Sequence, residues 1–418
     1  MNGELKVKKD WEIKKLGDIC EFRRGLTYSK NDEVENSKNA VLRSNNIDLI
    51  TNQLDLSEIK YISDKIKIDD TKKVKLNSLL ICTANGSKAH LGKVALIDDD
   101  YGFAFGGFMG LLIPSENIYP RFFYYALISD NYKRFIKSLS DGANINNLKF
   151  QDLSNFEIPV PPLEEQKRIV KILDEKFAQL EAIKTNAQTN LQNAKDLFQS
   201  QLKKIFNNKD LKKKKLSDLC ELISGYAFDS KGYTSNDEDT LLICGDNIMH
   251  CSFRWETVKK WPKEQYNDLK RFELKEYDIV LAMDRPWIKS GLKISKITEN
   301  ELPSLLVQRT AAIRTTRKIL SEYLYYALQE ESFSKYLVDQ QTGAGVPHIS
   351  GKQILNFEVG IPLSPSTRSE DLELRSIVKE LDSLSEKVKA LCAIYENQIA
   401  DCEELKKSLL AKAFEGNL

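Results

Sequence analysis

The sequence predicts an α+β protein with two β-rich domains that are related by an internal repeat, each followed by a long helix. Three observations predict this fold. Two stretches of more than forty residues lack proline and glycine and carry apolar residues at heptad spacing, which is typical of paired helices. The apolar framework of the first half returns about 200 residues later. Short apolar runs bounded by turn residues fill the segments between the helices, as strands do.

The first long helix is predicted to open at Pro161, because proline fits the first turn of a helix and Glu164 and Glu165 favour its positive end. It continues to Phe206, and Lys184 and Gln201 are polar breaks in its apolar seam. The seam consists of Val170, Leu173, Phe177, Leu180, Ala187, Leu191, Ala194, Phe198 and Ile205. At 1.5 Å per residue the helix would span roughly 65 Å, too long for one compact domain to cover. It therefore needs a partner helix.

The chain itself supplies that partner between Ser366 and Glu415. The seam of this second helix consists of Leu374, Val378, Leu381, Val388, Cys392, Tyr395, Ile399, Cys402 and Leu409. Ile169–Lys171 returns as Ile377–Lys379 at an offset of 208, whereas the preceding domains match at 200 to 201. The seven extra residues lie around Ser364–Leu372. They could lengthen the second helix or form an extended entry loop, and the sequence leaves both open.

The repeat also covers the domains that precede the helices. Lys15–Glu21 returns as Lys215–Glu221, and Phe123–Leu127 returns as Leu324–Leu328. The predicted organisation is a first domain at 1–160, a first helix at 161–208, a second domain at 209–363 and a second helix at 364–418. Because 418 residues exceed what one hydrophobic core ordinarily holds, two or more domains are expected.

Within each domain the sequence predicts mainly strands and one well-defined helix. The clearest strands are Leu79–Cys82, Val94–Ile97, Asp278–Leu281 and Ala311–Arg314. The helices are Tyr119–Ser138 and Ser321–Val338. Their aromatic residues recur at helical spacing, which favours a place in the core over a platform for stacking bases.

The two halves share their apolar framework but differ in their polar loops. One fold used twice with different polar side chains is what reading two short DNA sequences requires, although loops that simply drift would diverge too. Asn46 and Asn247 are shared by both halves, which favours a role in the fold or at a phosphate. Each other candidate could equally be structural or face solvent. The DNA-binding candidates are Arg43, Asn45, Asn46, Asn85, Ser87, Lys88, His90, Asn144 and Lys149 in the first domain, and Asp246, Asn247, Arg254, Arg285, Trp287, Lys289, Gln308, Arg309, His348 and Lys352 in the second.

Motifs for catalysis, metal binding and membrane insertion are missing from the sequence. It has no Asn-Pro-Pro-Tyr or Asp-Pro-Pro-Tyr quartet, and Gly86 and Gly92 are one residue too far apart for a phosphate loop. The three histidines are scattered and have no partners at metal spacing. No apolar run is long enough to cross a membrane, and the first residues lack the apolar core of a signal peptide. Because seven cysteines cannot all pair, we expect a cytoplasmic protein in a reducing compartment. The net charge of +1 neither supports nor excludes nucleic acid.

The junction after the first domain and the end of the chain carry a resemblance to a known family. The junction Asn155–Gln166 reads NFEIPVPPLEEQ, and Ser408–Phe414 reads SLLAKAF. With the two-fold repeat, these segments make the chain similar over essentially its whole length to the specificity subunit of a type I restriction-modification enzyme. The second junction, Ile361–Ser366, departs from the pattern and leaves the start of the second helix open.

The resemblance implies a function. Two target recognition domains would each bind one half of a bipartite site in double-stranded DNA, and the two helices would pack as an antiparallel coiled coil that sets the spacer. The helices would also dock modification subunits, two in the family, which methylate adenine at N6, and restriction subunits would join them. This chain would be non-catalytic and bind no cofactor, while S-adenosylmethionine, ATP and Mg would bind to the partner subunits.

Two other functions are compatible with the residues. A coiled-coil scaffold that binds proteins only, without DNA specificity, is the main alternative. Binding to DNA that weakens steeply with salt would separate the two, since phosphate contacts release counterions. A self-sufficient DNA enzyme is the third possibility, and methyltransferase activity of this chain alone would favour it.

Overall fold

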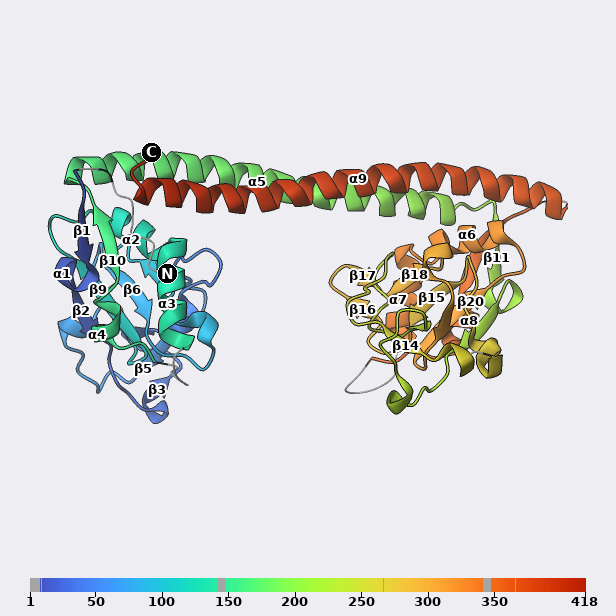
Figure 1. The fold of residues 1–418 in the computed structure, drawn as a ribbon, viewed down its shortest axis with the longest axis horizontal. Coiled ribbons are helices and arrows are strands. Elements are labelled where there is room, and N and C mark those ends of the chain that lie inside the picture. Colours follow the sequence, from blue (N-terminus) through green and yellow to red (C-terminus); the bar gives the residue numbers. More distant parts are fainter. Residues whose placement is uncertain (1–7, 9, 142–146, 266, 341–346, 365) are drawn as a thin grey trace. The chain divides into compact units, whose positions relative to one another are not determined.

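The computed structural model describes residue 8 and residues 10–141, 147–265, 267–340, 347–364 and 366–418. The chain divides into two compact units (Figure 1). Unit 1 comprises Met1–Gln188 and Asn397–Leu418, and unit 2 comprises Thr189–Glu396. Each unit therefore contains one globular domain and a part of each long helix.

Both predicted long helices are present. Helix α5 spans Leu163–Phe206 and helix α9 spans Thr367–Phe414, with 44 and 48 residues. Both end at equivalent phenylalanines, so four of the seven inserted residues lengthen α9 and the rest lie in the loop before it. In the described ranges no helix is both long and apolar enough to cross a membrane.

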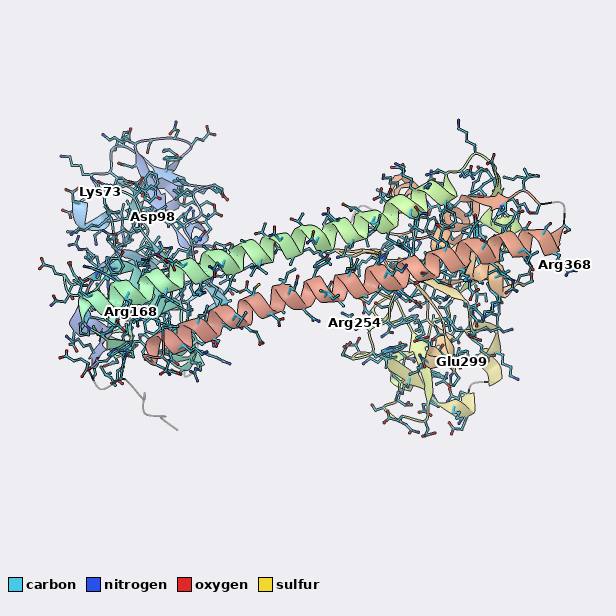
Figure 2. The ribbon with its side chains drawn as sticks, turned by 90° about the horizontal axis from the view of Figure 1, so that it is seen from above. Lys73, Asp98, Arg168, Arg254, Glu299 and Arg368 are labelled. Atoms are coloured by element: carbon cyan, nitrogen blue, oxygen red, sulfur yellow. The ribbon has the colours of Figure 1, made fainter. Side chains whose placement is uncertain are left out.

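In unit 1 the start of α5 packs against the end of α9. Val170 and Leu173 share a buried core with Leu410 and Phe414. The guanidinium of Arg168, labelled in Figure 2, donates to the carbonyl of Leu418 at 2.6 Å. Lys184, a polar break in the predicted seam, pairs with Glu403 at 2.5 Å.

In unit 2 the end of α5 packs against the start of α9. Leu202 shares a buried core with Leu374 and Leu381. The Gln201 amide donates to the Glu380 carboxylate at 2.8 Å. The two helices therefore run antiparallel in each unit, and the polar breaks in the seam hydrogen-bond across it.

The domain of unit 1 is built on a four-stranded sheet of order β2-β9-β6-β7. A second sheet has the order β3-β5-β4-β8, and β1 pairs with β10. The strands are β1 (Glu12–Lys15), β2 (Cys20–Arg24), β3 (Glu33–Val34), β4 (Asn39–Leu42), β5 (Lys60–Ile62), β6 (Leu79–Cys82), β7 (Val94–Leu96), β8 (Ala104–Phe105), β9 (Met109–Pro114) and β10 (Glu157–Val160). The helices are α1 (Leu16–Ile19), α2 (Pro120–Ile128), α3 (Asp130–Asp141) and α4 (Phe150–Leu153).

Unit 2 repeats this topology. Its four-stranded sheet has the order β12-β20-β15-β18, β14-β13-β19 form the second sheet, and β11 pairs with β21. The strands are β11 (Leu211–Lys215), β12 (Glu221–Ser224), β13 (Thr240–Ile243), β14 (Lys259–Trp261), β15 (Ile279–Ala282), β16 (Trp287–Ile288), β17 (Gly291–Leu292), β18 (Ile294–Lys296), β19 (Ser304–Leu306), β20 (Thr310–Arg314) and β21 (Glu358–Pro362). The helices are α6 (Lys318–Ala327), α7 (Glu331–Gln340) and α8 (Gly351–Asn356).

The central strands are buried on both faces. In β6, Leu79 and Ile81 face the core that contains α2 and the long helices, while Leu80 and Cys82 face a second core. Successive side chains of a strand point to opposite faces, so a strand covered on both sides reads as a continuous apolar run. This is why the four runs proposed as strands are all strands, with ends within one residue of those predicted.

The prediction of one helix in each domain was wrong, because two helices occupy each segment. Ser129 is extended, with φ −67° and ψ 159°. Its hydroxyl accepts a hydrogen bond from Tyr132 N at 3.4 Å, as a residue that caps a helix start does. In unit 2 the Glu330 carboxylate accepts from Ser332 N at 3.0 Å between α6 and α7. The aromatic residues nevertheless lie in the core, as predicted.

The seven cysteines are all free thiols. Cys20 and Cys220, which occupy equivalent positions, donate to the carbonyls of Leu16 and Leu216 at 3.2 and 3.0 Å. Burial raises the pKa of each of these two thiols to about 12. Both are therefore protonated and pack as small residues against the core.

Gln166, the last residue of the Pro-Pro-Leu-Glu-Glu-Gln junction, has a structural role. Its side chain is 1% exposed. The amide oxygen accepts from Tyr119 N at 2.8 Å, and the amide nitrogen donates to the carbonyls of Asn117 and Pro161 at 3.1 and 2.9 Å. This one residue satisfies backbone groups at the starts of both α2 and α5. In unit 2 the equivalent position holds the buried, apolar Leu374.

We expect Gln166→Leu to destabilise unit 1 by about 1–3 kcal/mol, because it keeps side-chain volume and leaves buried backbone groups without partners. Denaturant unfolding followed through Trp11, which lies in the same core, measures this. Gln179→Leu, on the exposed side of α5 within unit 1, is the matched control. Equal stability of the two variants would contradict the assigned role.

Candidate nucleic-acid interface

The main sheet of unit 1 has one end near the long helices and one end away from them. Strand β9 ends at Pro114 and leads into α2, whose Phe122 packs on Phe414 with ring centroids 5.1 Å apart. We call the opposite end, where β2 and β6 end and β9 begins, the distal end. The loops there follow β2 and β6 and precede β9 (Figure 1). The loop after β6 includes four of the nine DNA-binding candidates of the first domain, Asn85, Ser87, Lys88 and His90.

Backbone hydrogen bonds of the same pattern join the distal loops in both units. In unit 1 they run from Gly25 N to Met109 O (3.2 Å), Thr83 N to Phe108 O (2.9 Å) and Leu148 N to Thr83 O (2.7 Å). In unit 2 they run from Gly225 N to Thr310 O (3.1 Å), Met283 N to Arg309 O (2.8 Å) and Ile349 N to Met283 O (2.9 Å). The two units therefore present one backbone frame with different side chains.

Glycine is required in this frame after β2 and β12. A Cβ on Gly25 would lie 2.0 Å from the carbonyl oxygen of Gly106, and one on Gly225 would lie 2.0 Å from that of Val307. No side chain fits at such a distance. The close approach holds the loop that precedes β9 or β20 against the end of β2 or β12.

A buried lysine fixes a further loop in each unit. Lys93 donates to the carbonyl of Ile47 at 2.6 Å, and Lys293 donates to that of Gly245 at 2.7 Å. Burial lowers the pKa of the Lys93 amine. The loops after β4 and β13 are thereby tied to the main sheets.

Asn46 and Asn247 were named as DNA-binding candidates for which a role in the fold or at a phosphate was favoured, and the structure gives both a role in the fold. They are 1% and 0% exposed. Asn46 accepts from Arg43 N at 2.8 Å and donates to the carbonyl of Asp55 at 2.8 Å. Asn247 accepts from Cys244 N at 3.2 Å and donates to the carbonyl of Arg254 at 3.1 Å. Both amides hold their own loops together, which explains why both halves carry asparagine there.

The candidates of the first domain lie mostly around the distal end. The Asn85 amide donates to the hydroxyl of Ser44 at 2.9 Å, which joins the loop after β6 to the exposed Asn45 and the half-buried Arg43. Arg43 also pairs with Glu33 at 3.5 Å. Ser87 is exposed, and the half-buried His90 has an Nδ1 atom without a partner among the described residues. Lys149 is exposed at the start of α4, and Asn144 lies outside the described residues.

In the second domain a carboxylate organises the distal loops. Asp284 forms an ion pair with Arg309 Nη1 at 3.2 Å through one oxygen and contacts His348 Nδ1 at 2.5 Å with the other. The Arg309 side chain is still 71% exposed. Arg285 and Gln308 are exposed beside it. This arrangement places a guanidinium at the surface beside a carboxylate.

The remaining candidates of the second domain are less closely grouped. Arg254, labelled in Figure 2, is exposed and donates to the carbonyl of Asp246, itself exposed, at 2.9 Å. Lys352 is exposed on α8. Lys289 lines a cavity beside α5 and α9, away from the distal loops. Trp287 is half-buried; its indole donates to Ser334 at 2.9 Å and its ring packs against the core.

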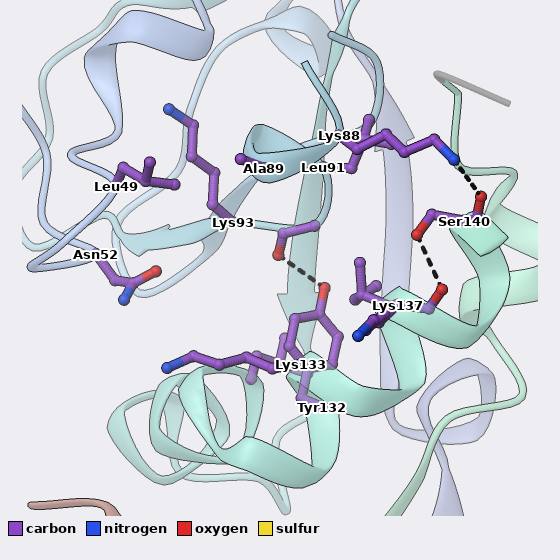
Figure 3. Close-up of a pocket in the computed structure, with 13 residues that line it drawn as sticks. Leu49, Asn52, Lys88, Ala89, Leu91, Lys93, Tyr132, Lys133, Lys137 and Ser140 are labelled. Carbon is purple, nitrogen blue, oxygen red and sulfur yellow. Dashed lines mark hydrogen bonds between the residues drawn. The ribbon is translucent and has the colours of Figure 1, made fainter. Parts of the chain in front are cut away.

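A cavity of about 400 Å³ in unit 1 carries four lysines (Figure 3). Lys133 and Lys137 come from α3, Lys88 from the loop after β6, and Lys93 from the start of β7. None of the described residues lining it is acidic. At the positions equivalent to Lys133 and Lys137, unit 2 has Ser334 and Val338. The cationic cavity is therefore a feature of the first domain.

Sequence reasoning missed three features of these surfaces. Lys133 and Lys137 were read only as part of a core helix, and Asp284 was not chosen among the residues of its loop. Phe108 is 73% exposed at the start of β9, where the equivalent residue is Arg309. The available signal for Phe108 was a large apolar residue after Gly106 and Gly107, where the other half has arginine.

Among the residues that the structure describes, no group of three or more His, Cys, Asp or Glu side chains could hold a metal ion. Besides Asp284 and His348, the polar candidates in and around the distal loops are mainly amides, guanidiniums, amines and hydroxyls. Such groups donate to phosphates and to the edges of bases.

Comparison with known proteins gives one consistent result. The model of the type I restriction modification DNA specificity domain matches twice, at residues 8–192 and 208–391. The MjaVIII specificity subunit of Methanocaldococcus jannaschii is 27% identical over 89% of this chain and 87% of its own length. The EcoKI specificity subunit of Escherichia coli is 26% identical over 99% of this chain and 90% of its own.

Solved structures share the fold. A chain from a study of complex assembly and conformational transition of the type I R-M system matches with a TM-score of 0.76 and 19% identity, over 99% of this chain and 100% of that one. The HsdS subunit of Thermoanaerobacter tengcongensis matches with a TM-score of 0.53 and 19% identity, over 100% of this chain and 99% of that one. The chain therefore belongs to the type I restriction-modification DNA specificity family, and each half carries one copy of the family's domain.

Proposed function

We propose that this chain is the DNA-recognition subunit of a type I restriction-modification enzyme and that each domain binds one half of a bipartite site. The observation that carries the proposal is the pair of distal ends. They share one backbone frame but present Asn85 and Phe108 in unit 1 and Asp284 and Arg309 in unit 2. A constant frame positions a domain on DNA, and the side chains that differ address different base edges.

Arg309 is the best-supported base contact. A guanidinium binds the O6 and N7 atoms of guanine in the major groove through two parallel hydrogen bonds. Asp284 holds Arg309 from one side at 3.2 Å and leaves most of its side chain exposed. The arginine can therefore meet a base with little loss of side-chain freedom.

Arg309→Ala is expected to lower discrimination at one guanine of the second half-site by about 1–3 kcal/mol. Each 1.4 kcal/mol is a factor of ten in relative affinity. Competition binding with duplexes substituted at each position measures it, and Arg368→Ala, an exposed arginine at the start of α9, is the matched control. Weakening that is equal for every duplex would instead identify Arg309 as a phosphate contact.

The exposed lysines of the cavity, Lys88, Lys133 and Lys137, are proposed to hold the DNA backbone. The test is a salt titration of binding between the full chain and duplex DNA. For a protein that neutralises phosphates, the logarithm of the affinity falls linearly with the logarithm of salt concentration, with a slope of about −0.9 per phosphate. Affinity that does not change with salt would contradict the proposal and favour the scaffold, which the family assignment does not favour.

The helices α5 and α9 are proposed to set the distance between the half-sites and to dock two modification subunits that methylate adenine, with restriction subunits joining them. In this arrangement the chain is non-catalytic. S-adenosylmethionine, ATP and Mg would bind to the partner subunits. The family assignment and the antiparallel packing of both helices in each unit support this proposal.

A further inference from the structure

Phe108 and Arg309 occupy the same place in the two domains. The carbonyl of Phe108 accepts from Thr83 N at 2.9 Å, and that of Arg309 accepts from Met283 N at 2.8 Å. The next residues, Met109 and Thr310, pair with Cys82 and Ala282 at the ends of β6 and β15. The two side chains therefore start from equivalent positions of the frame, although the backbone of Arg309, with a φ of 64°, is left-handed and that of Phe108 is not.

The backbone at Phe108 is fixed although the ring is not covered. Its carbonyl also accepts from Ala84 N at 3.1 Å and from the Thr83 hydroxyl at 3.0 Å. Met109 N donates to the carbonyl of Gly106 at 2.8 Å and closes a tight turn around it. The ring remains 73% exposed. A large apolar side chain on a rigid turn is left in water at a free-energy cost that a partner surface removes.

The surroundings of Phe108 identify that partner as DNA. A cavity of about 580 Å³ beside it is lined by Lys30, Arg43 and Lys60, with Glu33 as the acidic residue among its described lining. Glu33 lies 3.5 Å from Arg43 and 4.0 Å from Lys60, so the cations outnumber the carboxylate that they share. An apolar group within a cationic rim matches a base edge flanked by phosphates.

The equivalence with Arg309 indicates which part of the DNA the ring meets. If Arg309 reaches a guanine edge in the major groove, the same point of the other domain also faces base edges in that groove. The apolar group that a base pair presents there is the C5 methyl group of thymine. The first domain also has Ala84 where the second has Asp284, so no carboxylate stands at that place to orient a cation.

We propose that Phe108 recognises a thymine of the first half-site by packing on its C5 methyl group, at the position where Arg309 reads the second half-site. The inference rests on the proposed function and deepens it. This contact with the methyl group requires no flipping or unstacking of the base.

The test is a double-mutant cycle between the side chain and the methyl group. Each thymine of both half-sites is replaced in turn by uracil, which removes only the methyl group. Binding is measured for wild type, Phe108→Ala, Phe108→Leu and Arg309→Ala, with the full chain in the assembly in which it is purified. For wild type, uracil at one thymine is expected to weaken binding by about threefold to fivefold, the contribution of one buried methyl group.

In Phe108→Ala the same uracil is expected to have no further effect, whereas Phe108→Leu, which keeps an apolar group, retains part of it. Arg309→Ala should respond to uracil as wild type does. Since the ring is exposed, Phe108→Ala should melt at the wild-type temperature, which separates binding from folding.

Two outcomes would overturn the inference. One is that Phe108→Ala weakens binding equally for every duplex, as a ring wedged between bases or placed on the backbone would. The other is that Phe108→Ala leaves all affinities unchanged. In both cases wild-type preference for the bipartite target over a scrambled duplex would remain, so the proposed function would stand. Loss of that preference in wild type would contradict the proposed function itself.

Discussion

Exchange of residues 216–357 for the same segment of a relative with a different target is expected to replace one half-site completely. The other half-site and the gap should remain. Leu216 N donates to the carbonyl of Phe357 at 2.9 Å, so these two residues close the second domain. The cut leaves the pair β11–β21 and both long helices native. Methylome sequencing of the host measures the motif.

The matched exchange takes residues 16–156 of the first domain. Leu16 N donates to the carbonyl of Phe156 at 2.8 Å, the equivalent closing bond. This exchange should replace the first half-site, which the first domain binds, and leave the second half-site unchanged. A change of both half-sites in either chimaera would contradict the assignment of one half-site to each domain.

Asp278→Ala is expected to destabilise unit 2 by about 3–5 kcal/mol, the typical effect of removing one partner of a buried ion pair. The Asp278 side chain is 2% exposed and accepts from Arg314 at 2.6 and 2.9 Å. It also accepts from Lys275 N at 2.8 Å. Its loss would leave the Arg314 guanidinium, which is 20% exposed, without its carboxylate. Denaturant unfolding through Trp255, Trp261 and Trp287, in a Trp11→Phe background, reports on this unit alone.

The first domain supplies a matched control for this prediction. At the equivalent positions it has Ser78 and Ile113, so the same sheet is built there without the ion pair. The double variant D278S/R314I transfers that arrangement and removes both charges together. Because replacing a whole buried pair is often close to neutral, it should recover most of the lost stability. A double variant as unstable as Asp278→Ala would contradict this account.

The long helices and the repeat could be predicted from sequence because their signals are local or recurrent. A heptad seam such as Val170, Leu173 and Phe177 depends only on residues a few positions apart. The repeat assigns the same fold to both halves before any element is identified. A continuous apolar run likewise indicates that β6 is buried on both faces.

Other features depend on contacts that sequence does not reveal. Helix α2 ends because the Ser129 side chain caps the next helix, a choice that helical spacing of aromatic residues cannot show. The repeat favoured a role for Asn46 in the fold or at a phosphate, but not the backbone groups of its own loop that its amide binds. The hydrogen bond from the half-buried Trp287 to Ser334, 47 residues away, is likewise not visible in the sequence.

The candidate site also depends on contacts between residues that are far apart in the sequence. Asp284 acquires its role from Arg309 and His348, which are 25 and 64 residues away in sequence but adjacent in space. The exposure of Phe108 follows from a turn fixed by Thr83 and Ala84. The sequence showed that the polar loops of the two halves differ. It did not show which of these loops meet at the distal end of each sheet.

The most direct test of sequence-specific recognition is methylome sequencing of a host that expresses this chain with the methyltransferase subunit of its system, compared with a host that expresses the methyltransferase alone. A new N6-methyladenine motif of two short half-sites separated by a fixed gap, present only with this chain, is the predicted result. No new motif, with both proteins soluble and associated, would contradict DNA recognition and favour a scaffold.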